Sequence, residues 1–281
     1  MRLAEIEVHI ASMEELRQIV SALRSLASMR MQQAAHAITS VRRYAAVIAT
    51  AIDDAIALLP EPPATVGIAR EGRRALIVCT SEQGFVGDFN ERLLDAAQAD
   101  LRTEDVLLMV GTRGSTLAEG RGWRASWSGP MATRVSSLTE TVHGLATELY
   151  RAIAGHEVES AAVFFARYQK GAAPTIERHP LFPLDLARRA PARALLPPLH
   201  NLSPAALLEQ LVAEYLLALL SEAVIESLAS ENAARFNAMV AAHDNVSRKL
   251  DELERQGRQA RQAEVTTELL DLVTGAEAAR S

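Results

Sequence analysis

The sequence is poor in several residue types on which other protein classes depend. It has one cysteine, Cys79, so neither an intrachain disulfide nor a thiolate metal site can form. Aromatic residues make up only 4% of the chain, which suits long helices better than a large β structure. The formal net charge is -6, and the only lysines are Lys170 and Lys249. Nucleic acid is therefore excluded as a main partner, because such binding depends on an excess of basic residues.

The motifs of nucleotide, metal and hydrolytic sites are also missing. A Walker A loop needs Gly-Lys, but Gln169 precedes Lys170 and Arg248 precedes Lys249. The sequence has no Gly-x-Gly-x-x-Gly turn, His-Glu-x-x-His pair or Gly-x-Ser-x-Gly elbow, and its 7 histidines are scattered. We expect a chain without catalytic residues, metal or cofactor of its own.

Long hydrophobic runs are absent as well. No stretch reaches the ~18 uncharged apolar residues that a spanning helix needs, and the first residues lack the apolar core of a signal peptide. We expect a soluble cytoplasmic protein, with attachment to a membrane complex left open.

What the sequence does contain is a long helical pattern at its start. Apolar residues recur from about residue 3 to residue 59, and no proline or glycine occurs before Pro60. Their mean step is about 3.5 residues, which favours a left-handed supercoil, and such a helix would be roughly 85 Å long. The predicted stripe is Ile6, Ile10, Met13, Leu16, Val20, Leu23, Ala27, Met31, Ala34, Ile38, Val41, Ala45, Ile48, Ile52, Ile56 and Leu59.

A second long helix is predicted at the other end. Ser203-Pro204 combines a capping residue with a proline suited to the first turn, and the pattern continues to about residue 276. Its apolar stripe is interrupted by small and polar positions such as Ala229 and Asn232. Helices of this length cannot be buried in an ordinary globular core, so they must pack on each other or on partners.

The middle of the chain has an α/β pattern. Strands are expected at 75–79, 105–110, 123–127 and 161–165, helices at 90–102 and 138–154, and a proline-rich loop at 179–204. Asp88 or Asn90 can cap the first of these helices. This order predicts a largely parallel, Rossmann-like sheet with helices on its faces, inserted between the long helices. The expected domains are 1–60, 70–200 and 203–281.

Three features of the middle segment each have two interpretations. Gly84 and Gly87 either cradle a phosphate at a helix start or let the turn pack closely without a ligand. Cys79 is either a small buried residue or a redox group. The segment 188–202 is either a partner contact or a plain linker.

The C-terminal residues resemble the gamma subunit of F-type ATP synthases. That family ends in a hydrophobic residue, Thr, any residue, Glu, two residues, an acid, three residues and Gly-Ala. The matching positions are Val265, Thr266, Glu268, Asp271, Gly275 and Ala276. Residues 226–239 and 80–90 resemble two further family stretches, the second through Gly84, Gly87 and Asn90, and 19–31 resembles a third loosely.

The resemblance implies a central rotor shaft that couples ion flow through a membrane ring of c subunits to ATP synthesis or hydrolysis on beta subunits. Its two long helices would wind around each other antiparallel, and the α/β domain would form a foot that holds the epsilon subunit. It implies a peripheral position on the cytoplasmic face of the inner membrane and no small-molecule substrate. The residues implied to contact the ring of alpha and beta subunits are Leu23, Arg24, Arg30, Thr266, Glu268, Asp271 and Gly275.

Departures from the family pattern indicate a divergent branch, for which the alternative sodium-type bacterial enzyme is one hypothesis. Leu23 replaces a methionine, Arg30 a lysine and Gln83 a basic residue. Arg24 and Arg30 either contact the beta subunits or are solvated helix residues. Thr266, Glu268 and Asp271 either contact the ring or only stabilise their own helix. A stand-alone α/β nucleotide-binding protein that dimerises through its helices, and a coiled-coil adaptor, are the competing functional hypotheses.

Overall fold

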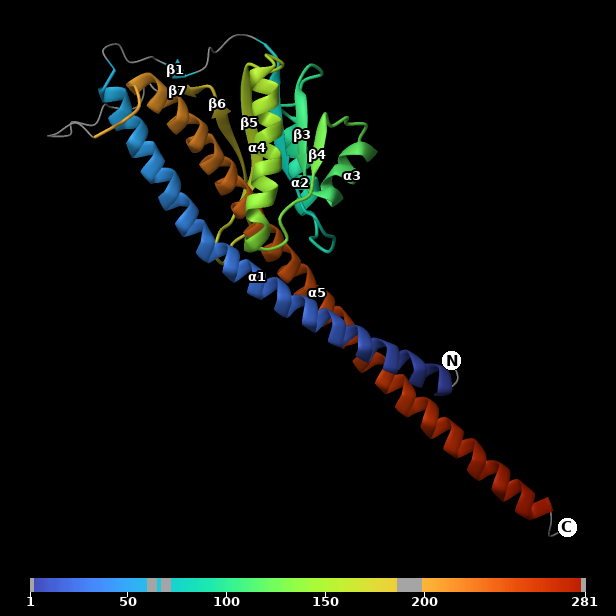
Figure 1. Cartoon of the computed structure of the whole chain (residues 1–281). Coiled ribbons are helices and arrows are strands. Elements are labelled where there is room, and N and C mark those ends of the chain that lie inside the picture. Colours follow the sequence, from blue (N-terminus) through green and yellow to red (C-terminus); the bar gives the residue numbers. More distant parts are fainter. Residues whose placement is uncertain (1–2, 60–64, 67–71, 186–198, 279–281) are drawn as a thin grey trace. The chain divides into compact units, whose positions relative to one another are not determined.

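A computed structural model of the chain describes residues 3–59, 65–66, 72–185 and 199–278 (Figure 1). Half of the proline-rich segment predicted as a loop, residues 186–198, lies outside these ranges. In the part that is described, no helix has both the length and the apolar content of a membrane span. The elements are α1 (Leu3–Ala57), β1 (Thr65–Val66), β2 (Arg74–Cys79), α2 (Phe89–Gln98), β3 (Val106–Val110), α3 (Thr112–Gly120), β4 (Trp127–Gly129), a 3-10 turn (Val135–Ser137), α4 (Leu138–Ala154), β5 (Ser160–Arg167), β6 (Thr175–Phe182), β7 (Leu184–Asp185) and α5 (Pro204–Ala278).

The chain divides into two compact units, and each is described on its own. The first consists of Met1–Leu26 and Phe236–Ser281, which contribute segments of α1 and α5. Figure 1 shows that these segments run antiparallel. They meet where Arg261 donates a hydrogen bond of 2.7 Å to the Glu7 carboxylate and where Gly257 lies against Ile6 and Ile10. Val20, Val246 and Leu250 are also buried, whereas Leu16 of the predicted stripe is 40% exposed.

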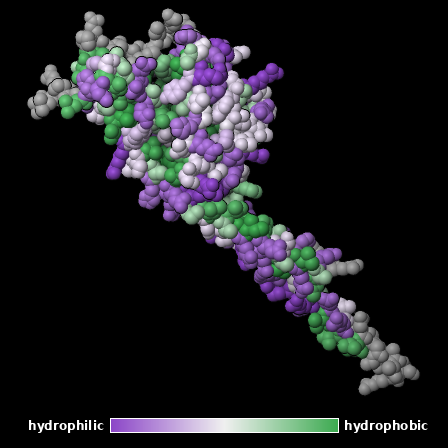
Figure 2. All heavy atoms as spheres, in the orientation of Figure 1, coloured by the Kyte–Doolittle hydropathy of each residue, from purple (hydrophilic) through white to green (hydrophobic). Residues whose placement is uncertain are grey.

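Beyond Arg261 the described part of α5 is exposed on every side. Several apolar residues are exposed in this segment, and Figure 2 shows green surface near this end of the helix. Apolar side chains gathered on one exposed segment mark an interaction surface more often than isolated ones do. The set is Val265, Leu269, Leu270, Leu272 and Val273.

The second unit, Ala27–Arg235, contains the sheet. Five strands are ordered β4-β3-β2-β5-β6; β2, β3, β4 and β5 are parallel, and β6 is antiparallel to β5. The continuous apolar runs of the central strands fit a sheet that is covered on both faces. The predicted fold class, a Rossmann-like domain between two long antiparallel helices, is confirmed.

Alternate residues of β2 show how the two faces are covered. Leu76 and Val78 pack with α2 and α3, whereas Ile77 and Cys79 pack on the opposite face, in the cluster that contains α4. The α1 and α5 segments of this unit complete the second face, with Ala34 and Ile38 from α1 and residues 216–229 from α5. The two long helices are thus part of the domain core.

The structure corrects several element boundaries. Residues 175–182 form the edge strand β6, although 179–182 were assigned to a loop because of Pro180; proline is tolerated at an edge because it lacks only the donor that an edge does not use. Helix α3 was not predicted, and β4 begins at Trp127, where the predicted strand ended. Asp88 occupies the N-cap of α2 without a side-chain capping bond, whereas Ser203 does accept one from the Ala206 amide.

Candidate functional site

The strand order defines where a fold of this type usually binds a ligand. The chain passes from β2 outward to β3 and β4, then returns so that β5 lies on the other side of β2. The connections therefore diverge at the carboxyl ends of β2 and β5, and in open α/β sheets ligands bind in the crevice formed at such a switch point. In this chain the crevice is occupied by helix α5.

Helix α5 is buried on all sides where it reaches the crevice. Every residue from 223 to 232 is buried, including the polar residues Glu226, Ser227, Ser230 and Glu231. A helix that is buried all round has no solvent face, so its polar side chains must find partners inside the protein.

Two serines of α5 join the ends of β2 and β5. Ser227 lies 3.5 Å from the carbonyl oxygen of Cys79, to which it donates, and accepts a bond of 3.3 Å from the Ala166 amide. Ser230 donates to the Ala166 carbonyl at 2.9 Å. The helix thereby satisfies backbone groups that the strand ends would otherwise leave for a ligand.

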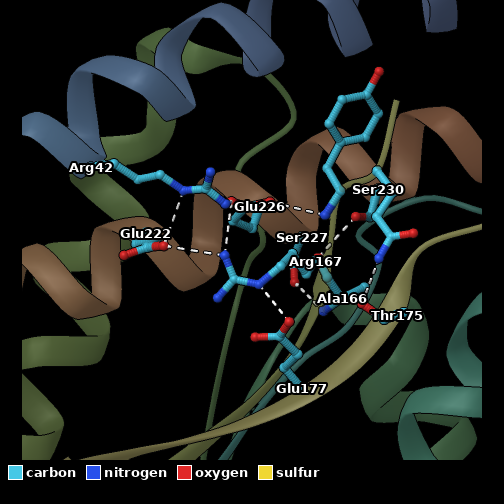
Figure 3. Close-up of polar contacts among 11 residues, drawn as sticks. Arg42, Ala166, Arg167, Thr175, Glu177, Glu222, Glu226, Ser227 and Ser230 are labelled. Atoms are coloured by element: carbon cyan, nitrogen blue, oxygen red, sulfur yellow. Dashed lines mark hydrogen bonds and ion pairs between the residues drawn. The ribbon is translucent and has the colours of Figure 1, made fainter. Parts of the chain in front are cut away.

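A charge cluster lies beside these serines (Figure 3). The fully buried Glu226 carboxylate accepts a bond of 2.9 Å from the Tyr168 amide and is paired with Arg42 of α1. Arg167 of β5 lies 3.6 Å from the same carboxylate and 3.5 Å from Glu222. Both guanidinium groups therefore converge on α5.

The outer end of the charge cluster reaches strand β6. Arg167 donates to Glu177 at 2.5 Å, and this hydrogen bond raises the pKa of Arg167, so that the guanidinium stays charged. The cluster consists of Arg42, Glu222, Glu226, Arg167 and Glu177, and it links α1, α5, β5 and β6.

Further along α5, Arg235 fastens the turn that follows β2. It donates to the carbonyl oxygens of Gln83 and Gly84, each at 3.2 Å, and to the Glu231 carboxylate at 2.6 Å. Burial raises the pKa of Glu231, against the opposing effect of Arg235. One Glu231 oxygen, Oε2, is buried without a hydrogen-bond partner in the described part of the chain.

The turn itself is closed by its own side chains. Asn90 accepts a bond of 2.9 Å from the Ser81 amide and donates to the Ser81 hydroxyl at 2.8 Å, and Gly87 has a φ of +60°. The Glu82 carboxylate accepts bonds from the Thr112 amide and hydroxyl, at 3.1 and 2.7 Å. A carboxylate thus occupies the N-terminus of α3, a position where phosphate groups are often bound.

The structure separates the residues expected from the sequence into different regions. Gly84 and Asn90 lie in the turn held by Arg235, and Gly87 lies between them without a bond to it. Leu23 and Arg24 lie on α1 in the first unit, whereas Arg30 belongs to the second. Thr266 and Glu268 are exposed on α5, and Thr266 donates to the Gln262 carbonyl at 2.8 Å. Asp271 and Gly275 lie in the same helix.

The sequence analysis did not single out the charge cluster. Glu226 and Arg235 lay in the stretch that carried the family resemblance, but no role was assigned to them. The available signal was a break in helical pattern, because charged residues stand at 222, 226, 231 and 235 between apolar residues on all faces of the helix. Arg42, Arg167 and Glu177 carry no comparable signal, because exposed arginine and glutamate are common on helices and edge strands.

Comparisons with known proteins agree with this architecture. The sequence model of the ATP synthase family matches residues 2–279. The gamma chain of Geobacter metallireducens is 26% identical over 98% of each chain, and that of Anaeromyxobacter dehalogenans is 28% identical over 98% of this chain and 99% of its own. A chain of the solved Euglena gracilis mitochondrial ATP synthase (OSCP/F1/c-ring, rotational state 3) has the same fold, with a TM-score of 0.67 and 16% identity over 98% of this chain and 94% of that one.

The chain therefore belongs to the ATP synthase family. Within the family it is a gamma chain, the subunit that forms the rotor of the central stalk in F-type ATP synthases. The identity inferred from the C-terminal motif is confirmed.

Proposed function

We propose that this gamma chain transmits rotation between a membrane ring and a catalytic head without binding a nucleotide itself. The filled switch point supports this proposal above all. Ser227 and Ser230 bond to the strand ends where a ligand would lie, and Glu82 occupies the N-terminus of α3. Of the two interpretations of Gly84 and Gly87, this packing favours the closed turn, because the groups that the turn presents to Arg235 are carbonyl oxygens.

The proposed partners follow from the family and from the relatives. The Euglena structure is described as an assembly containing F1 and a c-ring. We infer that this chain contacts alpha and beta subunits in the head, an epsilon subunit at the α/β domain and a ring of c subunits. It would then lie peripherally on the cytoplasmic face of the membrane.

The head is proposed to meet the exposed helices. The segment after Arg261 exposes apolar residues together with Thr266 and Glu268, which suits a surface that contacts a partner. Functionally, we divide the chain into a shaft formed by 1–60 and 203–281 and a foot formed by 70–200. The proposed ring contacts are Leu23, Arg24, Arg30, Thr266, Glu268, Asp271 and Gly275.

Two measurements test the proposal. Titration calorimetry of the isolated chain with ATP, ADP and NAD is expected to give no stoichiometric heat of binding. Affinity purification of the tagged chain from its host membrane is expected to recover alpha, beta, epsilon and c subunits. Tight nucleotide binding to the isolated chain, or recovery of the chain without alpha and beta subunits, would contradict it.

A further inference from the structure

The charge cluster of Arg42, Glu222, Glu226, Arg167 and Glu177 is placed where mechanical load must pass. Under the proposed function, a twist that enters at the foot has to reach the two helices. Contacts between α5 and the sheet include an apolar cluster, with Ala223, Leu220 and Phe165 among its members, and the hydrogen bonds of Ser227 and Ser230. Apolar burial is non-directional, so it resists separation of two surfaces much more than it resists their sliding.

Hydrogen bonds and paired charges differ in this respect because their strength depends on distance and angle. Glu226 is fully buried, and its carboxylate is fixed by the Tyr168 amide while two guanidinium groups approach it from different elements. In surroundings of low dielectric such a network is stiffer than the same pairs in water. Sliding α5 along the sheet would break several of these bonds at once.

The charge cluster joins both long helices to the sheet, whereas the shared carboxylate of Asp100 pairs with arginines of β2 and β6 only. Arg42 joins α1 to Glu222 and Glu226 of α5, and Arg167 joins β5 to the same two carboxylates. By contrast, Arg151 pairs with Glu148 and Glu157, all within the α/β domain. The shared carboxylates connect both helices and the sheet at a single place.

We propose that the charge cluster is the joint that carries torque between the helix pair and the α/β domain. The residues act as positioning residues: they contact neither nucleotide nor ion, and they hold the foot in a fixed angle to the shaft. This inference rests on the proposed function and adds to it the residues through which the load passes.

The test uses the complete complex in membrane vesicles. The variants are Arg42→Glu, Arg42→Gln and Arg42→Lys, with Arg151→Met as the matched control. Arg42 is 46% exposed in its side chain, whereas its partner Glu226 is fully buried, so a thermal melt of the isolated chain checks that each variant folds. The readouts are ATP hydrolysis, ions pumped per ATP, and rotor torsional stiffness measured on single molecules.

We expect Arg42→Glu to lower torsional stiffness about twofold, because one of two guanidinium links to the shared carboxylates is lost and a like charge is added. Ions pumped per ATP against a steep gradient should fall, while hydrolysis stays near the wild-type rate. Arg42→Lys, which keeps the positive charge beside Glu222 and Glu226, should retain more of both properties than Arg42→Glu, and Arg151→Met should change neither.

Unchanged stiffness and pumping in Arg42→Glu would overturn the proposal, as would an equal loss in Arg42→Lys while its thermal midpoint matches the wild type. Should Arg42→Glu fail to assemble, Arg42→Gln supplies the same comparison without a reversed charge. Failure of the proposed function is a different result: the wild-type complex would then lack the chain or pump no ions.

Discussion

Replacing Arg235 with methionine should destabilise the α/β domain, because the buried carboxylate of Glu231 then has no cation beside it. Methionine keeps the length and the apolar stem of the side chain, so the packing changes little. The Glu231 carboxylate, only 3% exposed, loses the cation that lies 2.6 Å from it. Breaking a buried pair in this way costs about 3–5 kcal/mol.

The loss of stability in Arg235→Met should grow as pH rises. Burial already holds the pKa of Glu231 above its ordinary value of 4.5, and removal of Arg235 takes away an effect that lowers it. A carboxyl group with a raised folded pKa contributes fully below its unfolded pKa and loses that contribution as pH rises through the folded pKa. The difference between wild type and Arg235→Met is therefore expected to be smallest below pH 4.5, where the bonds to the Gln83 and Gly84 carbonyls are still missing, and to grow above it.

Urea unfolding followed by tryptophan fluorescence is the suitable assay, because Trp123 and Trp127 both lie in the α/β domain. The double variant Glu231→Gln with Arg235→Met should recover about 2 kcal/mol of the single variant's loss, since no charge is left buried. Arg151→Met, at an exposed pair, is the control and should have little effect. Equal losses in the single and double variants, or a loss independent of pH, would refute this reasoning.

Three further outcomes are expected. Gly111→Ala should cost more than about 2 kcal/mol in urea unfolding, because Gly111 has a φ of +107° and a Cβ would meet the backbone of Thr80, the residue after β2, whereas Gly120→Ala, into open space, should be neutral or slightly stabilising; equal effects would contradict this. Cys79, whose pKa burial raises to about 12, should react with thiol reagents only after unfolding, and rapid labelling of the native chain would disprove its burial. Burial raises the pKa of Asp100, but hydrogen bonds from Arg178 and Arg74 lower it, and the net effect is a pKa below the ordinary 3.8. The ionised Asp100 therefore stabilises the fold, and this contribution should be lost as pH falls through the lowered pKa. Arg178→Met should make the melting temperature fall less steeply at acid pH, and an unchanged dependence on pH would count against the pairing of Asp100 with Arg178.

The sequence predicted the elements that have strong periodicity or continuous apolar runs. Its predictions lie within a few residues of the structure for the long helices, the helix at 138–154 and the strands within β2, β3 and β5. Burial on one or both faces of these elements produces a regular pattern of apolar residues in the sequence. Strand β6 and helix α3 were missed since their signals are weak: β6 is an exposed edge with an interior proline, and α3 is a short helix with a glycine at each end and one within.

The charge cluster could not have been predicted in the same way. Its members come from residues 42, 167, 177, 222 and 226, and no local pattern states that such distant side chains converge. Of its members, only Glu226 lies in the stretch 226–239 that resembles the family. Arg42, Arg167 and Glu177 reach the cluster only through the tertiary fold, in which α5 is surrounded on every side.

That surrounded helix has a consequence for how the chain folds. The largest core of the domain combines residues 34 and 38 with residues 216–229, so its two ends in sequence are separated by almost the whole domain. During synthesis the sheet can pair strands before residues 216–229 have emerged, but the face that carries α4 and α1 then lacks α5. Long-range contacts of this kind slow folding and expose apolar surface in the meantime. We expect the nascent domain to depend on chaperones until the last helix arrives to close it.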